Sequence, residues 1–471
     1  MPPGRKRPLP LRLCEAALLA PYLNGFTVYL TVGDWYAMCL VSKNIKDMVR
    51  QVPMSFIRDL TLAGIVEIAP KIKIEEFTLC LEEGEGGALS TFPVADLCGS
   101  LTAFELIMHF DEPWNARVLV GLHALKRLVV RGLKSKRWSP QALKSLQGVE
   151  GLDKLESVGL YYLSGLGQIG QLGEVTGLKD LTLSHITALA DIRSVGNLTN
   201  LNSLTIIRSN VHNFEILAGQ LHSLTMLIMK DCHFLKSVAW IGTFLSLTTL
   251  NLDLLIEETN AESTFAPQVA IRDLSGLAAL SNLERFSLKN FKGHECELYS
   301  IVNNTNLRIL LLRNIAELTN LEFVQQFTLL HNFHVGHCPQ LTQANHLSRD
   351  KPGSVVQLHL ANNQLLPFDT LKNFYNLRSL YMSEWPRESL HSFHAPLLQV
   401  LTLKNHLSLK NIDPVGGCNN LRKIRLTNLP ELENVDCLTM LQHLHTIRIS
   451  KCPKIPQGAA LGQQLDALTD S

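Results

Sequence analysis

The residues of this chain best suited to hold a metal ion stand together in "HNFHVGHC", residues 331 to 338. His331, His334, His337 and Cys338 are all of the types that bind zinc. In an extended strand, however, His331 and His334 face opposite ways, because successive side chains alternate. The repeat described below also sends Cys338 into the core and leaves His334 on the sheet surface. We therefore predict no metal site here, and "HLHTIRISKC", residues 443 to 452, fails for the same reason.

Catalytic motifs are equally absent from the sequence. It contains no GxxxxGK[ST], no HExxH and no GxSxG. The glycine-rich "EEGEGGA", residues 82 to 88, is acidic, which is the wrong sign for a phosphate. Ser, His and Asp are plentiful, but no local motif marks a nucleophile. We predict no catalytic site and no cofactor, so the protein is not expected to be an enzyme.

One apolar pattern, L-x-x-L-x-L with other apolar residues allowed, organises most of the chain and recurs mostly every 21 to 25 residues. It begins at Leu125, Leu155, Leu178, Leu201, Leu224, Leu247, Leu283, Leu307, Leu330, Val355, Leu377, Leu398, Leu421 and Leu444. Weaker copies begin at Ile57, Ile74 and Leu101. The sequence thus holds about 17 units, and a regular repeat of this length indicates a stacked solenoid.

The pattern resembles the leucine-rich-repeat family over roughly residues 55 to 455. Each unit should form a short strand whose first, fourth and sixth residues point inward, as in Leu178, Leu181 and Leu183. Apolar residues then recur every third residue, which suits short 3₁₀ turns. We expect an α/β fold: a leucine-rich-repeat solenoid with a parallel concave sheet and a convex side of short 3₁₀ turns and loops.

The ninth residue of each unit varies. In the family, Asn or Cys at this position bonds the backbone of the neighbouring coil. Both polar and apolar residues occur there in this chain, so the resemblance implies an incomplete ladder; examples are Cys232, Cys338, Asn363, Cys452, Ile186, Ile315 and Leu429.

Two units are longer than the others. They contain "KSKRWSPQALKSLQG", residues 134 to 148, and "IEETNAESTFAPQVA", residues 256 to 270. Both should be surface loops. Each is either a tolerated insertion or a loop that touches a partner.

The third, fifth and seventh residues of each unit should line the concave face, and from the Leu125 unit onward they are mostly basic when charged. The acids there are Asp180 and Asp253, whereas the early units carry Asp59, Glu76 and Glu105. The residues that we predict to bind a partner are Arg285, Lys289, Arg313, Lys404, Lys423, Arg425 and Arg448.

A basic concave face fits an acidic or phosphorylated protein. The alternative is that Lys and Arg merely keep an exposed sheet soluble. Aromatic residues on the face are few, chiefly Tyr161 and Tyr381, so a single-stranded nucleic acid is not the expected partner.

The chain begins with a helical pattern, residues 9 to 50, that resembles an F-box. Leu9-Pro10 opens it, "ALLAPYL" supplies the first phrase, and "DWYAMCLVSKNIKDMV" supplies the second with its "VSK" core. The inserted "NGFTVY" departs from the family, as do Pro21 and Ile45, which stands where a tryptophan is usual. These departures put the docking function of the segment in doubt.

The resemblance implies a substrate receptor of an SCF-type ubiquitin ligase, whose F-box docks on a Skp-type adaptor. The docking residues would be Leu9, Pro10, Leu18, Leu19, Tyr22, Leu23, Leu40 and Val41. The alternative is an all-α cap on the open edge of a scaffold or regulatory subunit without any ligase role. We expect an F-box-like segment at residues 1–50, repeats at 51–455 and a tail at 456–471.

The composition points to the inside of a cell. The ten cysteines form no CxxC pair, and no run of 18 apolar residues exists, so neither a disulfide framework nor a membrane span is expected. The formal net charge of +1 selects no class of partner. We predict a cytoplasmic protein; "GRKR" near the start also matches a nuclear address, and a mitochondrial presequence stays open.

Overall fold

The computed structural model describes residues 57–60, 76–81, 101–108, 119–132, 143, 145–232, 234–235, 237–254, 271, 273–343, 355–366, 371, 374, 376–391, 393 and 395–455. Two compact units make up the chain, Met1–Ala188 and Leu189–Ser471. We describe each unit by itself.

The first unit is built on parallel strands that pair in chain order. Short 3₁₀ helices, η3 (Val149–Gly151) and η4 (Gly170–Glu174), lie in the connections. The strands are β1 (Ile57–Leu60), β2 (Glu76–Leu81), β3 (Ala103–Met108), β4 (Arg127–Arg131), β5 (Ser157–Tyr161) and β6 (Asp180–Ser184).

The second unit repeats the same plan with parallel pairing from one strand to the next. Its strands are β7 (Ser203–Ile207), β8 (Met226–Lys230), β9 (Thr249–Asp253), β10 (Arg285–Lys289), β11 (Ile309–Arg313), β12 (Asn332–Gly336), β13 (Gln357–Ala361), β14 (Ser379–Ser383), β15 (Val400–Lys404), β16 (Lys423–Thr427) and β17 (Thr446–Ser450).

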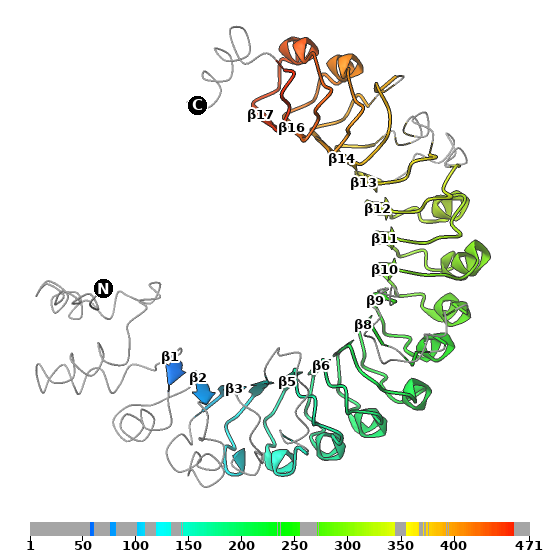
Figure 1. Cartoon of the computed structure of the whole chain (residues 1–471). Coiled ribbons are helices and arrows are strands. Elements are labelled where there is room, and N and C mark those ends of the chain that lie inside the picture. Colours follow the sequence, from blue (N-terminus) through cyan, green and yellow to red (C-terminus); the bar gives the residue numbers. More distant parts are fainter. Residues whose placement is uncertain are drawn as a thin grey trace, which may run out of the picture. The chain divides into compact units, whose positions relative to one another are not determined.

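On the side of this unit opposite its strands lie 3₁₀ helices (Figure 1). They are η5 (Arg193–Asn197), η6 (Phe214–Leu217), η7 (Ala239–Thr243), η8 (Ser275–Ala279), η9 (Glu295–Ile301), η10 (Glu322–Gln326), η12 (Asp413–Gly417) and η13 (Asp436–Met440).

The repeat register explains where the strands fall. From β4 onward, every strand covers the third to seventh residues of a repeat unit. Leu178, Leu181 and Leu183, at positions one, four and six, expose 0%, 1% and 0% of their surface. The predicted inward positions are therefore confirmed, and so are the predicted 3₁₀ turns. The parallel sheet, the 3₁₀ connections and the buried leucine positions together make a leucine-rich-repeat solenoid.

Side chains start several of the 3₁₀ helices. Asn320, Asn411 and Asn434 each accept a hydrogen bond from the backbone N–H two residues ahead, at 3.0, 2.6 and 2.7 Å. Such Asx turns satisfy a donor that the start of a helix leaves without a partner. All three residues occupy the same place in their units, so a local polar residue fixes where the convex side begins.

A left-handed corner ends the strands, a feature that the sequence analysis missed. The corner residue is always the eighth of its unit, and in twelve units it is not glycine yet has a positive φ, between 49° and 61°. Asn is the residue type most often found there: Asn290, Asn314, Asn362, Asn405 and Asn428. Asn tolerates this conformation better than most residues, so its recurrence at position eight was the available signal.

The ninth position carries a hydrogen-bond ladder in some coils only. The Asn363 Nδ2 donates to the Val335 carbonyl at 3.0 Å, and the Cys232 Sγ lies 3.7 Å from the Ile206 carbonyl oxygen and 3.5 Å from that of Lys230. Ile186, Ile315 and Leu429 are buried there and offer no donor. The predicted incomplete ladder is confirmed.

His406 joins this ladder in a way that the sequence analysis did not predict. Its side chain is 1% exposed, and its Nε2 lies 3.1 Å from the Met382 carbonyl oxygen. In the coils of Cys232, Asn363 and His406, the acceptor is the sixth residue of the preceding unit. A thiol, an amide and an imidazole thus serve one carbonyl position.

Among the described residues, no helix is both long and apolar enough to pass through a bilayer. Residues 256–270, the segment 1–50 and the tail 456–471 lie outside the described residues, as do residues 134–142 of the other long loop. The expectations for these segments remain predictions.

Candidate binding surface on the strand face of the second unit

The seven cations predicted to bind a partner all lie on strands of the second unit, at position three, five or seven of their repeat units. Six of them are exposed: Arg285, Arg313, Lys404, Lys423, Arg425 and Arg448. The seventh, Lys289, is partly buried, and its Nζ lies 3.5 Å from the Asp253 carboxylate. Lys289 therefore has a partner already and is the weakest candidate of the seven.

Four of these cations gather on three neighbouring strands, β15, β16 and β17. Arg425 is in register with Arg448, while Lys423 and Lys404 are in register with Thr446 and Thr427. In the part of the chain that the structure describes, no carboxylate forms an ion pair with any of these four. We call Lys404, Lys423, Arg425 and Arg448 the cationic patch. Like charges one strand apart create a positive potential that an anion would relieve.

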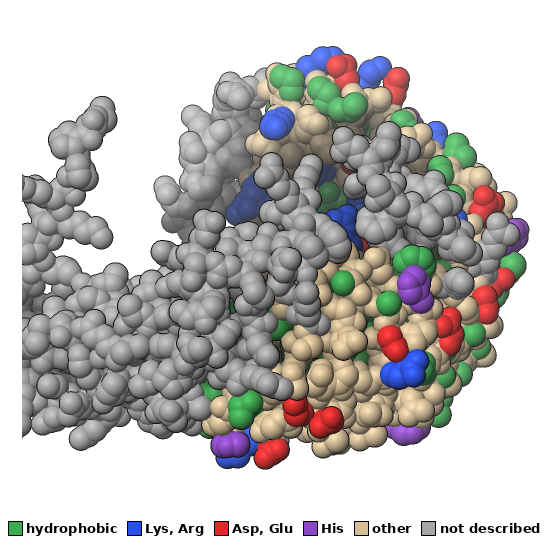
Figure 2. All heavy atoms as spheres, turned by 60° about the horizontal axis from the view of Figure 1, so that its bottom comes forward, with side chains coloured by type: hydrophobic (Ala, Val, Ile, Leu, Met, Phe, Trp, Pro, Cys, Tyr) green, Lys and Arg blue, Asp and Glu red, His purple; other side chains and the backbone are tan. Residues whose placement is uncertain are grey.

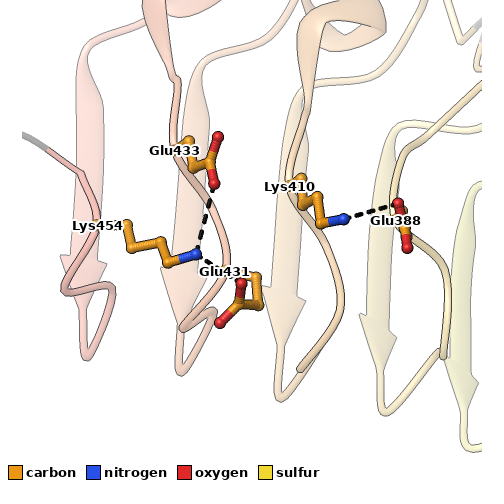
Figure 3. A network of polar contacts seen from close by, with 5 residues as sticks. All are labelled: Glu388, Lys410, Glu431, Glu433 and Lys454. Atoms are coloured by element: carbon orange, nitrogen blue, oxygen red, sulfur yellow. Dashed lines mark hydrogen bonds and ion pairs between the residues drawn. The ribbon is translucent and has the colours of Figure 1, made fainter.

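Three carboxylates in the loops that follow β14 and β16 are paired with lysines (Figure 3). The Lys410 Nζ contacts Glu388 at 3.0 Å, and the Lys454 Nζ contacts Glu431 at 2.6 Å and Glu433 at 3.4 Å. The hydrogen bond from Lys454 lowers the pKa of Glu431. Paired charges in the loops and unpaired cations on the strands make this end of the unit electrostatically two-sided.

The face seen in Figure 2 shows no comparable bias. Where it shows described residues, carboxylate, cationic and apolar side chains are interspersed. The surplus of cations on the strand face is therefore not repeated on the described surface of that view.

Three rings form a row next to the cationic patch. His334, His359 and Tyr381 are in register on β12, β13 and β14, each at position five of its repeat unit. The ring centroids lie 4.8 Å apart for His334 and His359, and 3.9 Å apart for His359 and Tyr381. The sequence analysis placed His334 and Tyr381 on this face but did not see that His359 joins them. We call these three residues the ring row.

The histidines of the ring row are uncharged at neutral pH. Partial burial lowers the pKa of His334, and burial together with His334 and Arg313 lowers that of His359 to about 4. These two histidines thus add no positive charge beside the cationic patch.

The residues beside the ring row are small. Gly336, Ala361 and Ser383 lie on β12, β13 and β14, each at position seven of its repeat unit. In the sheet they lie between Arg313 on β11 and Lys404 on β15. A Cβ at Gly336 would lie 3.1 Å from both the Cβ and the carbonyl oxygen of Ala361. No bulky side chain therefore stands at position seven on these three strands, where Gly336 and Ser383 are themselves buried.

The strand face of the first unit is electrostatically different. Arg131 forms an ion pair with Glu105, and its guanidinium lies 4.2 Å from the centre of the Tyr161 ring. This cation is already engaged on both sides. The side chains of Asp59 and Glu76 lie outside the described residues, so the predicted acidic start of the face stays a prediction.

The "HNFHVGHC" segment folds as the alternation of side chains predicts. Cys338 is buried, His334 lies on the strand face, and His331 is exposed and directly precedes β12. Among the described residues, no three or more His, Cys, Asp or Glu side chains are grouped so that they could hold a metal ion. Burial raises the pKa of the Cys338 thiol to about 11, so it is protonated at neutral pH.

The eight residues predicted to dock a Skp-type adaptor are outside the described part of the chain. They are Leu9, Pro10, Leu18, Leu19, Tyr22, Leu23, Leu40 and Val41. Their role stays a prediction from the sequence.

Comparison with known proteins gives no family by sequence: no family model matches the chain, and no curated protein does. An internalin (InlF) of Listeria monocytogenes is similar in structure, with a TM-score of 0.49 and 18% identity, over 78% of this chain and 93% of that one. TLR13 in its complex with ssRNA13 has a TM-score of 0.49 and 15% identity, over 90% and 56%. An LRR protein of Leptospira interrogans has 0.45 and 16%, over 89% and 98%.

Proposed function

We propose that this protein is a non-enzymatic scaffold that binds other proteins, and that the strand face of its second unit holds an acidic or phosphorylated segment of the partner. The observation that carries the proposal is the cationic patch, four cations on three adjacent strands without an ion pair among the described residues. Arg in particular binds carboxylate and phosphate through two parallel hydrogen bonds.

Solubility alone is a weaker account of these cations. A soluble surface needs charges of both signs, and the loops after β14 and β16 carry such a mixture, with Glu388, Glu431 and Glu433 next to lysines. The strand face of β15 to β17 carries cations alone. Selection for a partner of opposite charge accounts for that separation.

The test is a binding measurement with matched double variants. Degenerate peptides with a central phosphoserine and acidic flanks serve as the probe, and fluorescence polarisation gives the Kd. We expect Arg425→Ala with Arg448→Ala to weaken binding at least about tenfold, since one bond to a charged group contributes about 1.5–3 kcal/mol. Lys410→Ala with Lys454→Ala removes the same number of cations from the loops and should leave the Kd within about twofold. Equal losses in both variants would refute a site on the strand face.

We further propose that residues 1–50 dock a Skp-type adaptor, which would make the protein a substrate receptor of an SCF-type ligase. The support is the sequence resemblance alone: Leu9-Pro10, "ALLAPYL" and the "VSK" core. Such a receptor works by proximity, because a held target meets the ligase at high effective concentration. The alternative, a scaffold whose N-terminal helices are a cap, keeps the binding face and loses the ligase.

Binding of a purified Skp-type adaptor separates these two readings. The full chain should bind it, and a chain lacking residues 1–50 should not. No binding by a folded full chain would exclude the ligase role, while the peptide measurement above would still decide the function of the strand face.

A further inference from the structure

The position-five row of the second unit contains one gap between a ring and a guanidinium. Along the row, Tyr381 on β14 is followed by Thr402 on β15 and Arg425 on β16. Thr402 is a short side chain, partly buried, whereas Arg425 is exposed. The space above Thr402 is therefore bounded by an aromatic ring on one side and a planar cation on the other.

The width of this gap suits one flat group. Neighbouring strands lie about 4.8 Å apart, so the backbones that carry Tyr381 and Arg425 are about 9.6 Å apart. A ring stacked between them would lie about 4.5 Å from the Tyr381 ring and about 5 Å from the guanidinium. These are ordinary distances for ring stacking and for a cation over a ring.

Tyr381 is held in place for such contact. Its other side meets His359, with ring centroids 3.9 Å apart, and His359 in turn meets His334. A ring that is already packed loses little conformational entropy when a ligand binds. The wall of the gap is thus preorganised.

The gap also has cations at the distance of a substituent on the ring. Lys404 lies two residues beyond Thr402 on the same face of β15, about 6.7 Å along the strand. Lys404 is exposed, and within the described residues it has no ion pair; Glu384, at the corner after β14, is not within ion-pair distance of it. Arg448 stands one strand beyond Arg425. An anion carried by the ring would therefore have cations on two sides.

We infer that the gap above Thr402 is a seat for a phosphotyrosine side chain of the partner, with its ring between Tyr381 and Arg425 and its phosphate held by Lys404 and Arg448. This inference rests on the proposed function and names the residue that the strand face selects. Phosphoserine and acidic side chains would use the cations but leave the ring wall without a contact.

A nucleic acid fits these observations less well. Binding of a single strand depends on successive bases stacking on successive aromatic side chains along a cationic groove. On this face the rings are packed against one another, and only Tyr381 has a side that faces a gap next to a cation. One seat for one ring favours a single modified residue in a peptide.

The test compares three degenerate peptide libraries with the same acidic flanks and a central phosphotyrosine, phosphoserine or tyrosine. We expect the full chain to bind the phosphotyrosine library at least about tenfold tighter than the phosphoserine library. Tyr381→Leu removes the ring wall, and Thr402→Leu fills the gap. Each should abolish the preference while leaving phosphoserine binding within about twofold. Thr205→Leu makes the same change at position five of the β7 repeat unit, away from the cationic patch, so it is the matched control and should keep the preference.

The outcomes separate the two proposals. Equal affinity for phosphotyrosine and phosphoserine would overturn the ring seat and leave the acidic-partner proposal standing. Failure of every anionic library to bind would overturn both. Tighter binding of a 13-nucleotide single-stranded RNA than of any peptide, weakened by Tyr381→Leu, would overturn the inference in favour of a nucleic acid. Thermal melting of each variant shows that it is folded, and Thr402→Met, which is also larger than threonine, serves if Thr402→Leu does not fold.

Discussion

The most direct test of how the coils are held together is Asn363→Ala. Asn363 is 1% exposed and sits at the ninth position of its unit. Its Nδ2 donates to the Val335 carbonyl at 3.0 Å, and its Oδ1 accepts from the Cys338 N–H at 3.2 Å. The side chain thus satisfies two buried backbone groups of the preceding coil.

The expected loss follows from those two groups. A buried donor or acceptor left without a partner costs about 1–3 kcal/mol, so the two together should lower the free energy of unfolding by about 2–6 kcal/mol. Asn363→Leu fills the volume as Leu429 does in its own coil, but it leaves the same two groups unsatisfied. We therefore expect it to recover only part of the loss.

Hydrogen exchange read by mass spectrometry is the appropriate assay, because coils of a repeat array can open separately. Peptides that cover residues 335–340 should exchange faster in Asn363→Ala, while peptides from β16 and β17 should not change. Denaturant unfolding gives the global loss.

Asn306 provides the control, since its amide makes one exposed bond to the Ser281 carbonyl at 3.0 Å. Asn306→Ala should change stability by less than about 0.5 kcal/mol. If Asn363→Ala loses less than about 1 kcal/mol and the Cys338 amide stays protected, the ladder does not stabilise the coils and the reasoning is refuted.

Three further predictions follow from burial and close packing. Burial lowers the pKa of His406 below its usual 6.5, so the unfolded chain takes up the proton first as the pH falls. The free energy of unfolding should therefore decrease as the pH drops below about 6.5. His406→Asn should flatten this pH dependence relative to the parent protein, and an unchanged pH profile would contradict the assignment. Gly276 in η8 faces the Ala239 carbonyl, with which an added Cβ would clash, so Gly276→Ala should lower the free energy of unfolding by about 1–3 kcal/mol. Gly417→Ala in η12, where a Cβ would meet nothing within 4 Å, should not lower it. Denaturant unfolding measures both variants. Burial raises the pKa of the Cys232 thiol to about 12, while Cys296 is exposed. Peptide mapping after brief iodoacetamide treatment should therefore find Cys296 labelled and Cys232 unlabelled until the chain unfolds. Early labelling of Cys232 would show that its coil is not closed.

The sequence predicted the scaffold well because the scaffold is periodic. Leu178, Leu181 and Leu183 repeat a pattern that has one physical solution, a strand with an inward edge, and each strand from β4 onward falls where the pattern places it. The strand β1 departs from this rule: it begins at position one, Ile57, and its pairing with β2 shifts register. A weak copy of the repeat does not fix its own register.

The candidate site could be predicted only in part. The cations were visible because position alone marks the strand face. The ring row was not recognised, since His334, His359 and Tyr381 are more than twenty residues apart in sequence and meet only through the register of neighbouring strands. The left-handed corners were missed for a different reason: Asn recurs at position eight, but the sequence analysis did not consider that position or the tolerance of Asn for a positive φ.

The ninth position has a consequence for how such a chain diverges. Cys232, Asn363 and His406 each reach a sixth-position carbonyl of the preceding coil, so a coil needs a donor at a place and not a particular residue. Substitutions among donors then drift without altering the backbone, as do exchanges of one apolar residue for another at the leucine positions. A lineage of such coils can lose nearly all recognisable ancestry while its architecture stays fixed.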